Sequence, residues 1–278
     1  MALAFVGVAI FAGTLPATRV AVAWFDPAWV ALGRAIGAAG VAAVALWLTR
    51  SPMPPRSLWR PIALSAFGVV LGFPLFTSLA MRTGQVAHGA IVVALLPFAT
   101  AALAHHRLGE SKPVRFWIAG LAGTVLVLVF ALSRSGPASM QTNLILLCAV
   151  AAAALGYVEG GRIAAVLGGW QSISWCLIAA APLLIGPAAW LTLSQPFAQA
   201  PLSAWFAFGY VTLLSQWLGF LFWYGGMSRA GVAGASQVQL LQLFLTLSIS
   251  ALFLGEPVGW PEWLTAAAVV VTILLGRR

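Results

Sequence analysis

Residues 72–110 read GFPLFTSLAMRTGQVAHGAIVVALLPFATAALAHHRLGE, and residues 219–256 read GFLFWYGGMSRAGVAGASQVQLLQLFLTLSISALFLGE. Both stretches open with Gly-Phe, carry Arg-x-Gly at the same place and close with Leu-Gly-Glu, with one residue less in the second. In each, long apolar runs flank the Arg-x-Gly. Three shared landmarks in register across about forty residues indicate an internal duplication.

The composition places most of the chain in lipid. Of its 278 residues, 62% are hydrophobic and only 7% are charged, which is too little polar surface for a soluble domain of this size. The net charge of +9 therefore points to Lys and Arg in cytoplasmic loops. No basic run is interleaved with aromatic residues as a nucleic-acid groove requires, so we expect no nucleic-acid partner. Cys148 and Cys176 are predicted to be small core residues without a disulfide.

Ten apolar runs predict an all-α polytopic membrane protein. Pro-, Gly- and charge-containing breaks separate the runs. We expect no cleavable signal peptide, because the first run lacks a basic segment before it and resembles a retained span. The expected spans are 2–22, 27–48, 60–81, 86–105, 114–132, 143–163, 170–193, 203–226, 231–254 and 259–276.

The loop charges predict the orientation. One set of alternate loops holds ten Lys and Arg residues and the other holds three, so both termini are expected in the cytoplasm. An odd number of spans in each copy means that the copies cross the membrane in opposite senses. The predicted organisation is a first five-helix repeat over 1–134, a linker over 135–142 and an inverted second repeat over 143–278.

Polar residues recur along one face of the ninth span. Ser236, Gln239, Gln242 and Thr246 follow three- and four-residue spacing, and the two glutamines fall near the middle of the bilayer. Polar atoms in hydrocarbon must face protein or water. The stripe is therefore either a hydrogen-bonded seam between helices or a wall that faces a substrate.

Aromatic residues and prolines mark other candidate sites. The eighth span also carries Ser215 and Gln216. Aromatic side chains at helical spacing usually serve packing, and the alternative here is that they enclose a substrate side chain. Proline frees a carbonyl and permits a bend, which suits gating. The aromatic candidates are Trp217, Phe220, Trp223, Tyr224, Phe73, Phe76 and Tyr157, and the gating prolines are Pro16, Pro74 and Pro97.

Few charged residues lie within the spans. Glu159 either pairs with Arg162 at i, i+3 or serves as a partner for a substrate amine or a proton. Arg34 either extends to the interface or faces a cavity and meets a carboxylate. His88, near the outer mouth, is assigned a loop-end role ahead of a proton-linked one. Glu110 and Glu256 are interpreted as structural pairs or caps.

Several absences exclude other functions. The sequence has no G-x-x-x-x-G-K-[ST] loop and no His/Cys/Asp/Glu cluster at metal spacing. The spans contain no acid pair and no Ser–His–Asp set. We therefore expect no enzyme activity, no metal and no cofactor.

The two inverted five-span halves, each with Arg-x-Gly and a closing Leu-Gly-Glu, resemble the drug/metabolite transporter superfamily in its EamA-like branch. Gly13-x-x-Pro16-x-x-Arg19 is similar to the first-span motif of that family only in part. Trp175 stands where Arg34 stands in the first half, so this arginine is not repeated. The resemblance implies a bacterial plasma-membrane exporter with a central cavity lined by spans 1, 3, 4, 6, 8 and 9. Family substrates include amino acids, other metabolites and drugs.

The expected function is a secondary transporter that exports aromatic or other neutral amino acids by alternating access. Export is expected to be facilitated or weakly linked to protons, because the spans hold few titratable groups. The alternatives are export of another small metabolite or drug and, in a different class, a membrane channel. The expected partners are a small-molecule substrate and the lipid bilayer, with no obligate protein partner.

Overall fold

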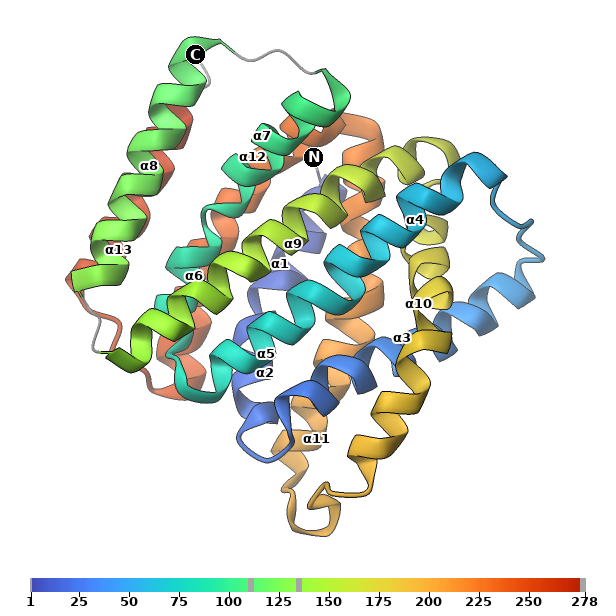
Figure 1. Ribbon diagram of the computed structural model, residues 1–278. Helices are drawn as coiled ribbons and strands as arrows, with labels where there is room; N and C mark the ends of the chain where they lie inside the picture. The colour runs from blue at the N-terminus through green and yellow to red at the C-terminus, as the bar shows by residue number, and fades with distance from the viewer. Residues whose placement is uncertain (1, 110–112, 134–136, 276–278) are drawn as a thin grey trace.

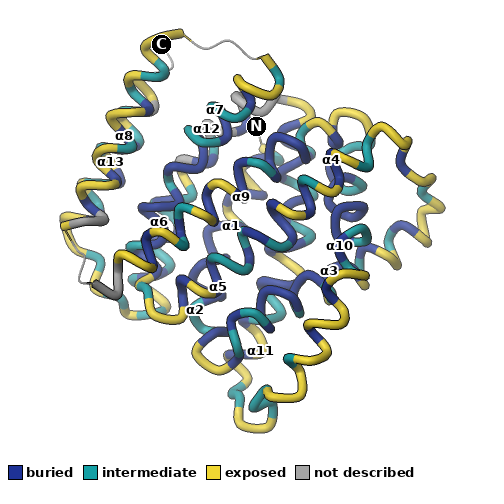
Figure 2. The backbone as a smooth tube through the Cα atoms, viewed as in Figure 1, coloured by how far each residue is buried: buried dark blue, intermediate teal, exposed yellow. Residues whose placement is uncertain are grey.

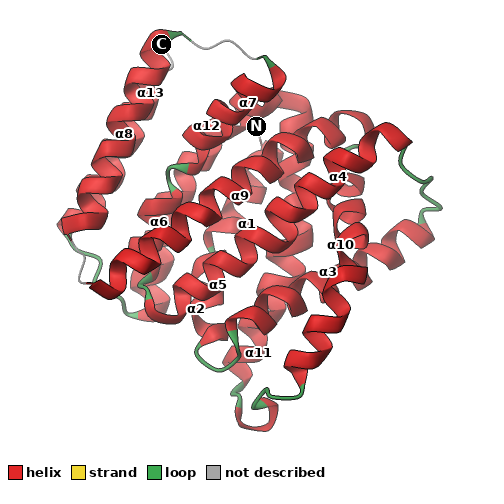
Figure 3. Cartoon of the chain, viewed as in Figure 1, coloured by secondary structure: helices red, strands yellow, loops and turns green. Residues whose placement is uncertain are grey.

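The computed structural model describes residues 2–109, 113–133 and 137–275, apart from the side chains of 131–132, 137–139, 230–234, 236–237, 240 and 273. Every element in these residues is helical, and none is a strand (Figure 3). The first half comprises α1 (Ala2–Ala12), α2 (Thr14–Val22), α3 (Pro27–Leu48), η1 (Arg56–Leu58), α4 (Trp59–Ser65), η2 (Ala66–Gly72), α5 (Phe73–Thr83), α6 (Val86–Val93), α7 (Leu96–Leu108) and α8 (Val114–Ser133). The second comprises α9 (Pro137–Leu167), α10 (Gly169–Thr192), η3 (Phe197–Gln199), α11 (Leu202–Gly209), η4 (Tyr210–Gly219), α12 (Phe220–Leu254) and α13 (Trp260–Leu275).

Seven helical stretches are long and apolar enough to cross a membrane, so the chain is a multi-pass membrane protein. Exposed residues lie on the outer faces of the helices and buried residues gather at the centre (Figure 2), and many of the exposed residues are large and apolar. The seven stretches coincide with seven of the ten predicted spans. Helix α8, the end of α12 and α13 occupy the other three positions, and the count of ten crossings stays a prediction.

Helix α12 contains a reversal of the chain (Figure 1). A straight helix of its 35 residues would extend about 50 Å. Gly219, just before it, packs against Ile10 and Phe11, and Gly226 packs against Ala4 at the beginning of α1. Thr246 then lies beside the end of α1, which is the middle of the first membrane span, and its Oγ1 donates to the Ala12 carbonyl at 3.0 Å. The two limbs of α12 therefore run past α1 in opposite directions.

A rare local structure occurs at the same place in both duplicated stretches. The π-helix η2 ends at Gly72, and the π-helix η4 ends at Gly219, the two glycines that open the repeated sequences. π-Helical turns are uncommon and are frequent at functional sites. The same irregularity in both copies shows that the likeness between the copies extends to backbone geometry.

Equivalent helices of the two copies pack antiparallel. The beginning of α3 meets the end of α10, where Trp29 Nε1 donates to Thr192 Oγ1 at 3.0 Å. At the opposite ends, Gln171 Nε2 donates to Ser51 Oγ at 3.3 Å. The beginning of α6 likewise meets the end of α12, through Glu256. Segments at the same position of each copy thus run in opposite directions.

The Leu-Gly-Glu motif has a structural explanation. Gly109 and Gly255 adopt left-handed backbone angles, with φ of 69° and 63°, and end α7 and α12. Glu256 then reaches across to the other copy and accepts from the Val86 and Ala87 amides at 2.8 and 3.0 Å. Ser250 Oγ donates to the same carboxylate at 2.5 Å. The interpretation of Glu256 as a cap is confirmed, while Glu110 lies outside the described residues.

Replacing Glu256 with alanine is expected to loosen the first turn of α6. The substitution removes the acceptor of two backbone amides and a favourable negative charge at a helix N-terminus, at a cost of about 1–2 kcal/mol. Hydrogen exchange should accelerate at the Val86 and Ala87 amides. Glu256→Gln, which keeps one oxygen, should give a smaller effect. Unchanged protection in both variants would contradict the capping role.

The cysteine prediction is half wrong. Cys176 is buried and free, as expected, whereas Cys148 is free but exposed. Apolar surroundings in the sequence do not distinguish a core position from one that faces lipid, because both are apolar in a membrane protein.

Candidate functional site

Two adjoining cavities lie between the halves. Each offers only about 20 Å³ of space to a water-sized molecule. The larger is lined by twelve residues and the smaller by nine, and both are lined by Leu15, Val93 and Gln242. Their walls come from α1, α2, α3, α5, α6, α7, α9, η4 and α12, so both copies contribute. The remaining lining residues are Phe11, Thr14, Arg34, Phe73, Leu96, Tyr157, Ser215, Gln216 and Phe220 in the larger cavity, and Ala90, Ala94, Pro97, Gln239, Leu243 and Thr246 in the smaller.

Two helix breaks border the cavities. The first span is divided at Gly13 between α1 and α2, and the fourth at Ala94–Leu95 between α6 and α7. Pro16 lies in the first turn of α2 and cannot donate to the Ala12 carbonyl, which instead accepts the Thr246 hydroxyl. Pro97 is the second residue of α7, and Pro74 is the second residue of α5, directly after η2. All three predicted prolines therefore lie where a helix changes direction or type.

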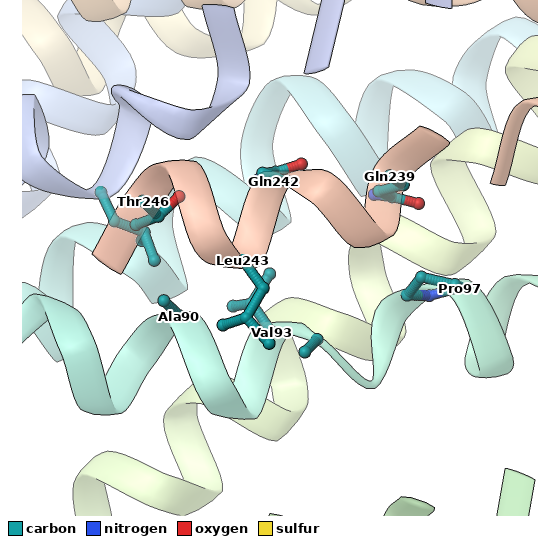
Figure 4. Close-up of a pocket in the computed structure, with 9 residues that line it drawn as sticks. Ala90, Val93, Pro97, Gln239, Gln242, Leu243 and Thr246 are labelled. Carbon is teal, nitrogen blue, oxygen red and sulfur yellow. The ribbon is translucent and has the colours of Figure 1, made fainter. Parts of the chain in front are cut away.

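The polar stripe of the ninth span serves two purposes. Thr246 donates to the Ala12 carbonyl at the end of α1, as a seam would require, while Ser250, next on the same face, donates to Glu256 just after its own helix. Gln239 and Gln242 line the smaller cavity, across from Ala90, Val93 and Pro97 (Figure 4). Their Oε1 atoms are buried without a hydrogen-bond partner. The Ser236 side chain lies outside the described residues.

The predicted aromatic residues divide into lining and packing groups. Phe73, Tyr157 and Phe220 line the larger cavity, and the Tyr157 hydroxyl interacts with Gln239. Trp223 and Tyr224 are buried behind this wall, where the Tyr224 hydroxyl donates to the Gly156 carbonyl at 3.0 Å. Trp217 Nε1 donates to Ser174 Oγ at 3.0 Å on α10, and half-buried Phe76 lines neither cavity.

Glu159 is held by two arginines. Its side chain is fully buried and forms ion pairs with Arg162 at 3.0 Å and with Arg107, at the end of α7, at 2.7 Å. The local pair with Arg162 is confirmed, and Arg107 is a second partner that the sequence did not indicate. Glu159 lines neither cavity.

His88 also lies outside both cavities. Its Nε2 is 2.5 Å from Asn143 Oδ1, and its ring stacks on Phe130 with centroids 5.9 Å apart. These contacts are those of a packed side chain near the helix ends, as the loop-end assignment expected.

Arg34 does not extend to the membrane interface. Only 1% of its surface is exposed, its Nη2 donates to Ser215 Oγ at 3.0 Å, and it lines the larger cavity. The interpretation as an interfacial arginine is therefore wrong, because the short polar side chain of Ser215 gives the guanidinium a partner inside. Thr14 Oγ1, at 2.8 Å from Ser215 Oγ, extends this polar group.

The sequence reasoning missed Thr14 as a lining residue. The available signal was its place at a helix break, directly after Gly13 and before Pro16. Among the residues that the structure describes, no group of three His, Cys, Asp or Glu side chains is placed to hold a metal ion.

The duplicated helical architecture and the cavity between the copies are typical of membrane transporters. A model of the EamA-like transporter family matches twice, over residues 1–132 and 140–276. The "Uncharacterized transporter YdeK" of Bacillus subtilis (strain 168) is 38% identical over 274 residues, which cover 99% of this chain and 95% of that protein. The chain therefore belongs to the EamA-like transporter family, within the drug/metabolite transporter superfamily, and is a transporter rather than an enzyme.

A solved crystal structure shares the fold. It superposes with a TM-score of 0.68 at 20% sequence identity, covering 98% of this chain and 94% of the other. At this identity the likeness concerns the fold alone.

Proposed function

We propose that the protein is a secondary transporter of the bacterial inner membrane that exports neutral amino acids, aromatic ones included, by alternating access. The observation that supports this best is the pair of cavities between the copies, with aromatic walls and buried amide oxygens that lack a partner. Such a wall can hydrogen-bond an ammonium group and enclose apolar side chains of different shape.

The proposed organisation is ten crossings in two inverted repeats, 1–134 and 143–278, joined by 135–142, with both termini in the cytoplasm. The antiparallel pairing of α3 with α10 and the matching π-helices η2 and η4 support the inversion. The ten Lys and Arg residues in one set of loops support the orientation. Helix α9 begins at Pro137, so part of the proposed linker is already helical.

The proposed substrate contacts come from both copies. Gln239 and Gln242 offer amide oxygens, and Phe73, Tyr157 and Phe220 enclose the side chain. Trp217, Trp223, Tyr224 and Phe76 support this wall from behind or beside it. The helix breaks at Gly13 and at Ala94–Leu95 are the points where the two halves can bend during the transport cycle.

Export is proposed to be facilitated or weakly proton-linked. Two acids of the described chain are buried in helices. Glu262 lies in the first turn of α13, and Glu159 lies outside the cavities and is bound by Arg107 and Arg162. No carboxylate among the described residues lines either cavity as a proton carrier. Flux that depends steeply on a pH gradient and vanishes in Glu159→Gln would contradict this coupling.

Counterflow in proteoliposomes tests the proposal. Labelled phenylalanine should enter vesicles preloaded with unlabelled amino acid, with saturation and at a rate that the preload increases, which a channel does not show. Gln242→Ala should lower the apparent affinity about tenfold, because a hydrogen bond to a charged group is lost. Gln199→Ala, on an exposed 3-10 turn, is the matched control and should leave transport unchanged.

Two outcomes would reject this function. Amino acids that fail to exchange, together with exchange of another metabolite or drug in the same assay, would move the protein to a different substrate class. Equal flux with and without preload, without saturation, would favour a channel.

A further inference from the structure

Arg34 is a buried arginine that has no counter-ion among the residues that the structure describes. It is the eighth residue of α3, about 10 Å into a span, and 99% of its surface is covered. Within the part of the chain that the structure describes, Nη2 donates to Ser215, and Nε and Nη1 are buried without partners. An arginine in this setting is costly unless it serves a function, because its charge and its donors lack compensation.

The acids of the described chain are engaged elsewhere. Asp26 caps α3, Glu159 pairs with Arg107 and Arg162, Glu256 caps α6, and Glu262 accepts from the Gly259 amide. None of these four forms an ion pair with Arg34. The charge that complements Arg34 is therefore expected to come from outside the described chain.

The neighbouring unpaired atoms are acceptors. Gln216 Nε2 donates to the Val69 carbonyl at 3.0 Å, and because a carbonyl only accepts, this bond fixes the orientation of the amide. Gln216 Oε1 is left buried without a partner, as is Oε1 of Gln242. Arg34, Gln216 and Gln242 line the same cavity. The cavity thus presents cationic donors and, separately, amide acceptors.

We infer that Arg34 binds the carboxylate of the transported molecule, with Gln216 and Gln242 accepting from its ammonium group. This inference rests on the proposed transport function and adds a requirement: the substrate carries a free carboxylate. A planar guanidinium recognises a carboxylate with two donors in a fixed fork, which an ammonium cannot reproduce. Cationic amines and amidated amino acids are therefore poor substrates.

Equilibrium binding to the purified full-length protein, followed by intrinsic tryptophan fluorescence, tests the inference. The probes are L-phenylalanine, its amide, 3-phenylpropionate and 2-phenylethylamine. The wild-type protein should bind phenylalanine more tightly than the amide by at least about tenfold, the value of a hydrogen bond to a charged group. In Arg34→Gln that ratio should fall to about one, and in Arg34→Lys it should fall only in part.

The ratio separates recognition from a structural role. General destabilisation affects both probes alike, so a purely structural Arg34 would leave the ratio intact in both variants. If Arg34→Gln does not fold, the same ratio is measured in Arg34→Lys, which keeps the positive charge but lacks the planar pair of donors. An unchanged ratio in the folded variant overturns the inference, as does wild-type protein that binds the amide as tightly as the acid or binds neither carboxylate probe.

The inference and the proposed function can fail separately. Binding of 3-phenylpropionate that depends on Arg34, without binding or exchange of any amino acid, would keep the carboxylate site and reject amino-acid transport. Exchange of phenylalanine that is unaffected by Arg34→Gln would keep amino-acid transport and reject the carboxylate site.

Discussion

Gly68→Ala is expected to lower the melting temperature strongly, although it adds a single methyl group. Gly68 lies in η2, where the added Cβ would be 2.4 Å from the Ala152 carbonyl oxygen and 2.6 Å from the Gly156 nitrogen. Both are backbone atoms of α9, so neither can rotate away, and the two helices must separate. Close approach of small residues is a main source of helix association in membranes. The cost should reach about 3 kcal/mol, at the upper end for overpacking.

Gly40→Ala is the matched control. Gly40 lies within α3, and an added Cβ there meets nothing within 4 Å. The same change should be neutral or stabilising by about 0.5–1 kcal/mol, because alanine restricts the unfolded chain and favours helix. Thermal unfolding followed by size-exclusion chromatography in detergent measures both variants. Equal melting temperatures for Gly68→Ala and Gly40→Ala would contradict this prediction, because they would show that α9 can move away from η2 at little cost.

Glu159→Gln is expected to give the second large effect. The carboxylate joins the end of α7, through Arg107, to α9, so its loss uncouples helices that sequence separates by about fifty residues. The Arg162 contact is a hydrogen bond and the Arg107 contact is an ion pair, and together they should contribute about 1–3 kcal/mol once the partial exposure of both arginines is taken into account. The melting temperature should fall by several degrees, and exchange of the last amides of α7 should accelerate.

The two arginines provide an internal comparison. Arg162→Gln removes a pair within one helix, three residues apart and half exposed, which contributes only about 0.5 kcal/mol. Arg107→Gln removes the tie between helices and should cost more than Arg162→Gln and less than Glu159→Gln. A larger effect at Arg162 than at Arg107 would show that the carboxylate stabilises α9 alone.

The sequence predicted the membrane class, the duplication and most span positions, because each depends on local regularities. Apolar length identifies a span, and the Arg-x-Gly and Leu-Gly-Glu landmarks identify the copies. The capping role of Glu256 could also be predicted from the sequence, because a glycine commonly ends a helix and an acid is favourable at a helix N-terminus. The partners of Glu256, the Val86 and Ala87 amides, could not be predicted, because they lie in the other copy.

The candidate site was harder to predict, since helical spacing shows which residues share a face but not what that face contacts. From the sequence, Arg34 could equally extend to the interface. Its position inside the fold depends on Ser215, which is distant in sequence and accepts a hydrogen bond from it. Trp223 and Tyr224 share spacing with Phe220, yet they pack behind it and bond or stack with α9. The ten-residue π-helix η4 adds to this difficulty, because its wider turns rotate the side chains that follow it away from the positions that an α-helix would give.

The pairing of equivalent helices across the copies has a consequence for how such a chain can diverge. Helix α3 packs on α10, α8 on α13 and α6 on α12. The faces that join the two copies are therefore also part of the buried interior of each copy. Neither copy is therefore expected to fold stably without the other. A substitution along one of these seams therefore changes the packing surface of both copies at once, and we expect substitutions on the two sides to be coupled.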